Sequence, residues 1–427
     1  MRKVAVVGGG WAGLAAAVQC IRAGHQVTLF EASRTLGGRA RSLEVALPDG
    51  TTAMLDNGQH ILIGAYVQAL RLMEDVGVDL QQALLRLPLT LRFPDGTGLR
   101  LPAWPAPLDA LTGMLGARGW GWRDKLSLLR HAAGWQCRGF ACAPELSVAV
   151  LCRDLAPRVV HDLVEPLCVA ALNTPAERAS AQVFLRVLRD SLFGGGHGQW
   201  AGSNLLLPRR DLGRLFPDAA RDWLRAHGAE IRMGARVHAL MRDGAQWRVD
   251  GEPFDAVLLA CPPWEAARLV EASGAPADGW LARVRALDYE PIATVYAMGR
   301  QALPLSLPSP MLSLRSDARR PAQFVFDRGQ LGGPAGLLAF VASASRGSLE
   351  ELQDQIVAQA ATLGWPVTPL RTVVEKRATF ACTPGLLRPG IAVAPGLWAC
   401  GDYVEGPYPA TLEGAVRGAI EAAGALT

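Results

Sequence analysis

The chain has 427 residues, of which 50% are hydrophobic and 19% are charged, so it can form two or three domains with well-filled cores. This composition excludes a disordered chain, a collagen-like repeat and a coiled coil. The formal net charge of +4, from 43 basic and 39 acidic residues, does not indicate nucleic-acid binding without a basic cluster. The eight cysteines and seven histidines lack the spacing of a metal site, and we expect reduced thiols in a cytosolic protein.

The N-terminal residues have the pattern of a βαβ unit. Residues 3–7 are predicted as an apolar strand and the glycine-rich residues 8–13 as a tight turn. An alanine-rich helix over 14–23 and a second strand over 26–31 follow. The same stretch is long and uncharged enough to suggest a signal peptide or a membrane span, but the glycines divide it. We therefore expect a mature N-terminus at or next to Met1.

Within this unit, Gly8, Gly10 and Gly13 form the spacing G-x-G-x-x-G. The first glycine permits the sharp turn, the second lets the backbone approach a pyrophosphate, and the third allows close packing of helix on strand. The pyrophosphate would rest at the helix N-terminus, where free N–H groups favour negative charge. Glu31 ends the second predicted strand and is placed to accept hydrogen bonds from a ribose. The pattern predicts a dinucleotide site.

The next three residues distinguish FAD from NAD. Gly37, Gly38 and Arg39 soon follow the ribose acid, and they would add an anion-binding turn and a cation to the same pyrophosphate. This G-G-R extension resembles that of the amine-oxidase and carotenoid-desaturase flavoproteins. It favours FAD, which we expect to be held without a covalent bond. The alternative for Arg39 is a solvated surface arginine.

The C-terminal region resembles the same flavoprotein superfamily. A buried strand is predicted to stop at Gly401 and Asp402, and a helix to begin near Thr411. The string from Asp402 onward, with P-A-T-L-E-G-A-V, is similar to the flavin-binding string of that superfamily. The resemblance implies that Gly401 and Asp402 contact the ribityl–phosphate arm. It also implies that the backbone of Leu412 and Glu413 meets the pyrimidine edge of the flavin.

Two internal segments extend the resemblance. The string LDNGQHILIGAY, from Leu55 to Tyr66, is similar to that of the hydroxysqualene dehydroxylase family, and the corresponding loop of the superfamily lies against the flavin. Gly58 is therefore expected at the cofactor. Residues 228–237 alternate like a strand, and the resemblance implies that its end, at Val237, contacts the adenine through its backbone.

The resemblance to hydroxysqualene dehydroxylases implies a reaction. Hydroxysqualene would lose its allylic hydroxyl group and gain a hydride from reduced flavin, giving squalene in hopanoid biosynthesis. The leaving hydroxyl group needs a proton or a hydrogen bond, and His60 and Asp56 are the candidate general acids, with Tyr289 and Tyr408 less favoured. For His60, a structural histidine bonded to the backbone is an equally good interpretation. The electron donor that reduces the flavin is not identified by any motif.

Three other functions remain open from the sequence. A carotenoid or phytoene-type desaturase shares nearly every motif. An amine or porphyrinogen oxidase is less favoured, because this chain has Thr294 at the position that aligns with the lysine of the amine oxidases. A non-enzymatic flavin-binding or prenyl-carrier protein is the third.

The expected fold is α/β, with a Rossmann-like doubly wound FAD-binding domain and a discontinuous α+β substrate domain, as in the amine-oxidase-like flavoproteins. The FAD-binding domain is predicted to comprise residues 1–83, 205–265 and 372–427. The substrate-binding domain is predicted to comprise residues 84–204 and 266–371.

A membrane contact is predicted within residues 104–138, which combine tryptophan, leucine and basic side chains. A helix over 124–135 near Trp120 and Trp122 is typical of a segment that lies in a membrane interface. An amphipathic helix covering a core is the ordinary alternative. The polyprenoid substrate implied by the resemblance favours the membrane. We expect peripheral attachment to the inner face of the cytoplasmic membrane.

Overall fold

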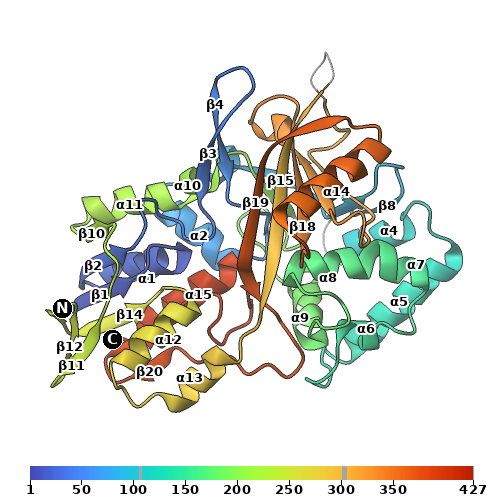
Figure 1. Cartoon of the computed structure of the whole chain (residues 1–427). Helices are drawn as coiled ribbons and strands as arrows, with labels where there is room; N and C mark the ends of the chain where they lie inside the picture. The colour runs from blue at the N-terminus through green and yellow to red at the C-terminus, as the bar shows by residue number, and fades with distance from the viewer. Residues whose placement is uncertain (105–107, 301–304, 427) are drawn as a thin grey trace.

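The structure is a computed structural model that describes residues 1–104, 108–300 and 305–426. A parallel sheet lies at one side of the molecule, near both chain termini (Figure 1). Its strands have the order β10 (Glu230–Met233), β2 (Gln26–Glu31), β1 (Lys3–Val7), β14 (Ala256–Leu259), β21 (Leu397–Ala399) and β20 (Ala392–Ala394), with only β20 antiparallel to its neighbour. The predicted N-terminal strands are confirmed.

The central strand β1 is buried on both faces, as its uninterrupted apolar sequence requires. Val4 and Val6 pack into one core with helices, and Ala5 and Val7 pack into another core. The helices of the first core are α1 (Trp11–Arg22), α2 (Val67–Asp75), α3 (Leu80–Ala83), α10 (Leu212–Leu215), α11 (Pro217–Ala226) and α15 (Leu412–Gly424). The second core includes the meander β11 (Leu240–Asp243), β12 (Gln246–Val249) and β13 (Glu252–Phe254), with α12 (Pro263–Ala272) and α13 (Asp278–Arg285).

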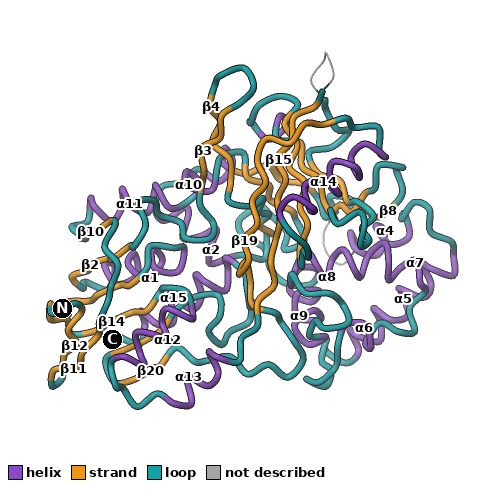
Figure 2. The backbone as a smooth tube through the Cα atoms, in the orientation of Figure 1, coloured by secondary structure: helices purple, strands orange, loops and turns teal. Residues whose placement is uncertain are grey.

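An antiparallel sheet forms the middle of the molecule, where its two long strands run side by side (Figure 2). Its strands have the order β16 (Met311–Ser313), β17 (Phe324–Asp327), β18 (Leu337–Ser343), β15 (Tyr289–Gly299) and β19 (Val367–Phe380). Helix α14 (Leu349–Thr362) packs on one face, and a short 3₁₀ turn spans Gly329–Leu331. The other face contributes Phe324, Tyr296 and Val341 to the second core.

Helices form the side opposite to the parallel sheet (Figure 1). They are α4 (Leu108–Leu115), α5 (Trp122–Cys137), α6 (Val148–Leu151), α7 (Pro157–Val159), a π-helical turn (Val160–Val164), α8 (Glu165–Leu172) and α9 (Ala181–Leu192). Other short strands pair with one another: β3 (Ser42–Ala46) with β4 (Thr52–Asp56), β5 (Leu62–Ile63) and β6 (Leu84–Leu87) with β9 (Leu205–Pro208), and β7 (Thr90–Arg92) with β8 (Gly98–Arg100). Within the described residues, no helix is long and apolar enough to cross a bilayer.

Two predicted domain boundaries fall at paired strands. The boundary at 372 lies inside β19, which pairs with β15 both before and after that position. The boundary at 84 separates β6 from β9, although these strands are hydrogen-bonded. The division into FAD-binding and substrate-binding domains therefore remains a proposal.

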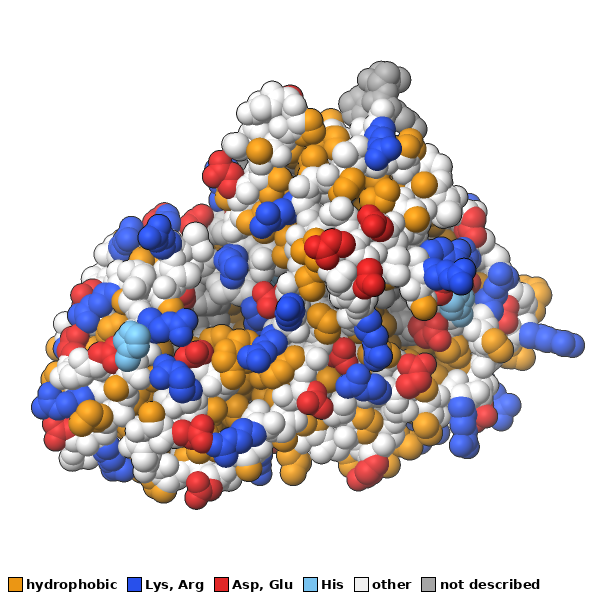
Figure 3. Space-filling model, in the orientation of Figure 1, with side chains coloured by type: hydrophobic (Ala, Val, Ile, Leu, Met, Phe, Trp, Pro, Cys, Tyr) orange, Lys and Arg blue, Asp and Glu red, His pale blue; other side chains and the backbone are white. Residues whose placement is uncertain are grey.

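Surface charge is mixed on the face seen in Figure 3, where basic and acidic side chains alternate with apolar ones. This distribution agrees with the small net charge of +4.

Candidate functional site

A cavity of about 740 Å³ extends between the parallel sheet and the antiparallel sheet. Most of the predicted site residues line it: Gly8, Gly10, Glu31, Gly38, Arg39, Gly58, His60, Val237, Gly401, Asp402 and Leu412. Gly13, Asp56 and Glu413 do not line it, nor do Tyr289 and Tyr408. Segments far apart in the chain therefore meet at one site, while their roles toward a cofactor remain proposals.

The glycines of the turn between β1 and α1 are each needed for a different physical reason. Gly8 has a φ of +114°, and a Cβ there would lie 2.7 Å from the carbonyl oxygen of Ala260. A Cβ on Gly13 would overlap the carbonyl oxygen of Gly8. Gly10 differs, because its φ of −76° suits any residue and a Cβ there would have no heavy atom of the chain nearer than 3.8 Å. Its missing side chain thus keeps open the cavity at the N-terminus of α1, which fits a pyrophosphate.

Glu31 lies at the end of β2 and faces this turn. One carboxylate oxygen accepts a hydrogen bond from the N–H of Gly9 at 2.6 Å, and the other accepts from the N–H of Ser33 at 2.7 Å. Each oxygen keeps a further lone pair, and the side chain lines the cavity. The carboxylate can therefore hold the glycine-rich turn and still accept hydrogen bonds from a ribose.

We expect Glu31→Ala to weaken FAD binding by about 1–3 kcal/mol, the cost of losing a hydrogen bond to a charged group. Fluorescence titration of the protein freed of flavin measures this affinity. Glu177→Ala, which removes an exposed carboxylate away from the cavity, is the matched control. An unchanged FAD affinity in Glu31→Ala would remove Glu31 from the site.

Arg39 and Asp402 form an ion pair at the cavity wall. Arg39 also donates a hydrogen bond to the carbonyl oxygen of Ala378 at 2.6 Å, so it does not extend into solvent as a free surface arginine would. Asp402 follows β21 in the chain and is buried. The pair brings a cation and a carboxylate from opposite ends of the chain to one point, where a phosphate and a ribityl hydroxyl group could each find a partner.

His60 lines the cavity, and its ring is bonded to the backbone of its own loop. Its Nδ1 donates to the carbonyl oxygen of Gly58 at 2.8 Å, which leaves Nε2 as an acceptor. Burial lowers the pKa of His60 below its usual value, and the charge of Arg39 lowers it further, against the opposing effect of the Gly58 hydrogen bond. To act as a general acid, His60 would first have to take up a proton.

Asp56 is buried behind this loop, outside the cavity, and this position does not support the predicted role of catalytic acid. Its carboxylate accepts the N–H of Leu212 at 2.7 Å and lies 4.0 Å from the guanidinium of Arg328. Tyr296 donates its hydroxyl hydrogen to the carbonyl oxygen of Asp56 at 2.9 Å. These contacts fix the start of the loop that carries Gly58 and His60.

Burial raises the pKa of Asp56 from 3.8 to about 6, against the lowering effect of Arg328. The folded protein then holds this proton more tightly than the unfolded chain, so the free energy of unfolding falls as pH rises from about 4 to 6. The fall amounts to about 3 kcal/mol at most, and it is complete above pH 6. Asp56→Asn removes this titration. Denaturant unfolding between pH 4 and 6 measures the effect, and we expect the free energy of unfolding of the variant to change less with pH than that of the parent. The same pH dependence in both proteins would contradict a raised pKa of Asp56.

The predicted strand ending at Val237 is shorter in the structure, because β10 ends at Met233. Gly234 follows with a φ of +67°, which turns the chain away from the sheet. The N–H of Ala235 then donates to the carbonyl oxygen of Glu31 at 2.8 Å. Val237 therefore lies in a loop, yet it still lines the cavity beside the end of β2.

Leu412 begins α15, whose N-cap is Thr411, and the first amide groups of this helix have no intrahelical partner. The N-terminus of α15 thus offers N–H groups and the positive end of the helix dipole to the cavity. The side chain of Glu413 points elsewhere. It accepts the N–H groups of Gln68 at 3.2 Å and Ala69 at 2.8 Å, and so holds the N-terminus of α2.

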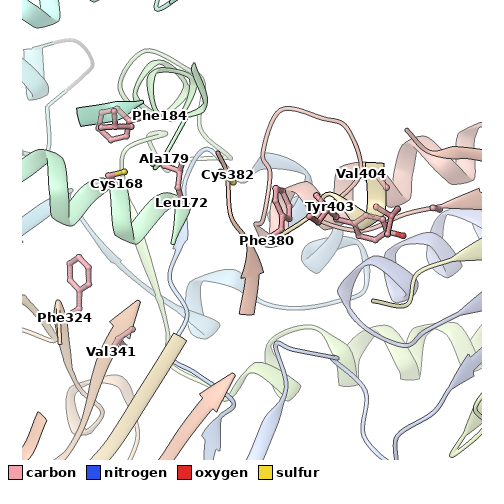
Figure 4. Packing of buried hydrophobic residues seen from close by; sticks show 14 of the residues in the cluster. Cys168, Leu172, Ala179, Phe184, Phe324, Val341, Phe380, Cys382, Tyr403 and Val404 are labelled. Carbon is pink, nitrogen blue, oxygen red and sulfur yellow. The ribbon is translucent and has the colours of Figure 1, made fainter. Parts of the chain in front are cut away.

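The remaining wall of the cavity is mostly apolar. It includes Leu172 and its neighbours at the end of α8, together with Phe324, Phe326 and Val341 of the antiparallel sheet. Figure 4 shows Leu172, Phe324 and Val341 in this region, with Phe380 and Tyr403 nearer the parallel sheet. This wall suits a hydrocarbon rather than a charged substrate.

Sequence reasoning missed several polar residues of the cavity. Glu375 on β19 accepts a hydrogen bond from the side chain of Asn57 at 3.4 Å, and both line the cavity. Asn173 adopts a left-handed conformation after α8 and links Thr379 to the backbone N–H of Ala344. No local motif marks these residues, because their neighbours come from distant parts of the chain.

Thr294 lies on β15, and it is the residue that we align with the lysine of the amine oxidases. Its hydroxyl group is buried without a hydrogen-bond partner in the described chain, and it lies 3.8 Å from the position of a Cβ on Gly58. None of the described residues that line the cavity is a lysine. Lys376 is exposed on β19. Among the described residues, no cluster of three histidine, cysteine or acidic side chains could hold a metal ion.

Comparison with known proteins gives a consistent result. The chain is 27% identical to a hydroxysqualene dehydroxylase of Rhodopseudomonas palustris, over 99% of this chain and 97% of that protein. It is 30% identical to a carotenoid phi-ring synthase of Streptomyces griseus, over 67% of this chain and 58% of that protein. An oxidoreductase from Methanosarcina mazei has the same fold, with a TM-score of 0.73, 16% identity, and coverage of 98% of this chain and 99% of that one.

The family described as flavin-containing amine oxidoreductase matches residues 11–427, which are nearly the whole chain. This match confirms the predicted fold class. With the glycine-rich turn, the Arg39–Asp402 pair and the N-terminus of α15 at one cavity, the chain belongs to the family of flavin-containing amine oxidoreductases and is a flavin-dependent oxidoreductase.

Proposed function

We propose that this protein binds FAD without a covalent bond and reduces hydroxysqualene to squalene by removing its allylic hydroxyl group. The observation that carries the proposal is the similarity to hydroxysqualene dehydroxylases over 99% of this chain and 97% of theirs. The apolar wall formed by α8 and the antiparallel sheet supports it, because a triterpene alcohol needs such a surface.

Non-covalent binding is supported by the state of the nearby thiols. Cys261 and Cys400 line the cavity. Burial raises the pKa of the Cys261 thiol to about 12 and that of the Cys400 thiol still higher. Both thiols therefore stay protonated at neutral pH, and a protonated thiol is a poor nucleophile.

In the proposed reaction the carbon–oxygen bond breaks, a carbon–hydrogen bond forms, and the hydroxyl group leaves as water after receiving a proton. Bound FAD, once reduced, would supply the hydride. The chain would hold the reacting carbon against the loop of Gly58 and His60, and the apolar wall would exclude water from the developing positive charge. His60 is the proposed proton donor, after its Nε2 has taken up a proton from solvent.

The test is product analysis under anaerobic conditions. Protein with chemically reduced flavin is incubated with detergent-dispersed hydroxysqualene, and the extract is analysed by mass spectrometry. We expect squalene, formed only with reduced flavin. Recovery of unchanged hydroxysqualene, with flavin bound and reduced, would overturn the proposal.

A carotenoid-type desaturase is the second candidate, favoured by the similarity to the Streptomyces griseus carotenoid phi-ring synthase. That activity would use oxidised flavin and would introduce a double bond. In the same experiment, oxidised protein and phytoene would then give a product with additional conjugation, which ultraviolet absorption detects.

We also propose peripheral attachment to the cytoplasmic membrane, from its inner face, because the substrate is almost insoluble in water. The segment 104–138 is the candidate contact, although its residues 105–107 lie outside those that the structure describes. Trp122 and Leu126 are 76% and 67% exposed on α5, whereas Trp120 is buried. The expected contribution of Trp120 was wrong, because its indole packs into the core.

We expect Trp122→Ser combined with Leu126→Ser to weaken sedimentation with anionic liposomes by about 10-fold or more, because two large apolar side chains lose their burial in the bilayer. The flavin content should stay unchanged. Met241→Ser combined with Leu387→Ser removes two exposed apolar side chains from other elements and is the matched control. Equal sedimentation of parent and Trp122/Leu126 variant would show that α5 does not contact the membrane.

A further inference from the structure

A second hollow in the surface is lined by arginine side chains. Arg86, Arg92 and Arg100 line it together with Trp104 and Thr112, and none of the described residues that line it is acidic. In the described part of the chain, neither Arg92 nor Arg100 has an ion-pair partner within 4.0 Å. Arg86 donates its Nε to the side chain of Asn204 at 2.6 Å, so its terminal nitrogens remain available. The hollow thus concentrates positive charge that the described residues do not neutralise.

The backbone fixes two of these arginines on one face. Arg100 on β8 pairs directly with Thr90 on β7, and Arg92 lies two residues after Thr90. Directly opposed residues, and residues two apart on a strand, share a face. The guanidinium groups therefore project from the same side of the hairpin, where a phosphate group could bind to both.

Exposed apolar side chains adjoin the hollow. Thr112, which lines it, lies on α4 between Leu108 and Leu115, one turn away on either side and on the same helix face. Trp104, Leu108, Leu111 and Leu115 are 38–55% exposed. These side chains are here called the apolar rim. Soluble proteins rarely expose a large contiguous apolar patch unless it is an interaction site.

The apolar rim continues onto α5. Lys125 donates to the carbonyl oxygen of Leu115 at 2.6 Å, and its ammonium lies 5.3 Å from the centre of the Trp122 ring. The exposed Trp122 and Leu126 therefore lie beside the end of α4. Figure 1 shows α4 and α5 at the edge of the molecule opposite to the parallel sheet.

We propose that this hollow binds the phosphate headgroup of an anionic phospholipid, and that the apolar rim enters the bilayer around it. This inference rests on the proposed membrane attachment and names its lipid chemistry. A phosphate oxygen accepts hydrogen bonds from Arg92 and Arg100, while Trp104 and the leucines of α4 lie at the acyl boundary. A free phosphate ion would use the arginines alone and would gain nothing from the apolar rim.

The experiment measures sedimentation of the flavin-loaded protein with vesicles of phosphatidylcholine alone or mixed with phosphatidylglycerol. We expect tighter binding to the mixed vesicles. Arg92→Gln combined with Arg100→Gln should weaken that binding about 10- to 30-fold. Arg225→Gln combined with Arg242→Gln removes the same charge from exposed positions on α11 and β11, and it should have little effect. If both double variants weaken binding equally, only net charge matters and the proposal is wrong.

Three further measurements complete the test. Trp104→Ser should weaken binding to the mixed vesicles, and no change would overturn the role of the apolar rim. Inorganic phosphate should release the protein no better than chloride at equal ionic strength, and selective release by phosphate would identify a site for soluble anions instead. Squalene formation from detergent-dispersed substrate should be unchanged in the arginine variants. A failure of that reaction in the parent protein would contradict the proposed chemistry without affecting the vesicle result.

Discussion

Gly10→Ala is expected to weaken flavin binding by about 10- to 100-fold or more while the protein without flavin remains as stable as the parent. The chain itself leaves room for the added methyl group, whose nearest protein atom would be 3.8 Å away, and the backbone at Gly10 suits alanine. The methyl group would instead occupy space beside the N-terminus of α1 that a pyrophosphate needs. The flavin-to-protein ratio from visible absorbance measures the effect.

Two other glycine variants are compared with Gly10→Ala, to separate an effect on flavin binding from an effect on folding. Gly13→Ala should destabilise the protein even without flavin, because its Cβ would overlap the carbonyl oxygen of Gly8. Gly279→Ala should change neither property, since nothing lies within 4 Å of its added Cβ and it does not line the cavity. Normal flavin content in Gly10→Ala would mean that the pyrophosphate does not bind at this turn.

Glu413→Ala is expected to lower the free energy of unfolding by about 3–5 kcal/mol, because a fully buried carboxylate that accepts three hydrogen bonds is lost, one of them from Arg417, which is 34% exposed. The carboxylate is fully buried, and Arg417 donates to it at 2.6 Å in addition to the two amide groups at the start of α2. Without it these donors lose their partner in the core. Because Tyr66 and Leu412 at the two helix starts line the cavity, flavin affinity should fall as well.

Denaturant unfolding of the flavin-free protein measures this effect, so that loss of cofactor does not contribute. Glu413→Gln keeps an acceptor for the amide groups of α2 and should cost less than the alanine variant. Glu421→Ala, an exposed carboxylate on the same helix, should change stability by less than about 0.5 kcal/mol. A loss below about 1 kcal/mol in Glu413→Ala would contradict the linking role of this side chain.

The parts of the fold that local chemistry determines could be predicted from the sequence. The glycines at 8, 10 and 13 fix a turn between a strand and a helix, and the structure has this turn between β1 and α1. Thr411 caps α15 by accepting the N–H of Gly414, so the start of the last helix was also predictable.

Features that depend on distant contacts could not be predicted in the same way. Trp120 and Trp122 are only two residues apart in the sequence, yet Trp120 is buried and Trp122 is exposed. The polar residue Glu375 reaches the cavity only because β19 pairs with β15, which no local pattern encodes. Asp56 has the residue type of a catalytic acid, but the fold buries it against Leu212 and Arg328, outside the cavity.

The most direct test of the proposed reaction is an anaerobic titration of the reduced protein with hydroxysqualene, followed by visible absorbance. Each equivalent of hydroxysqualene should restore one equivalent of oxidised flavin, with squalene formed in the same amount. Squalene itself should leave the flavin reduced. If hydroxysqualene leaves the absorbance of the reduced protein unchanged, the protein does not transfer a hydride to this alcohol.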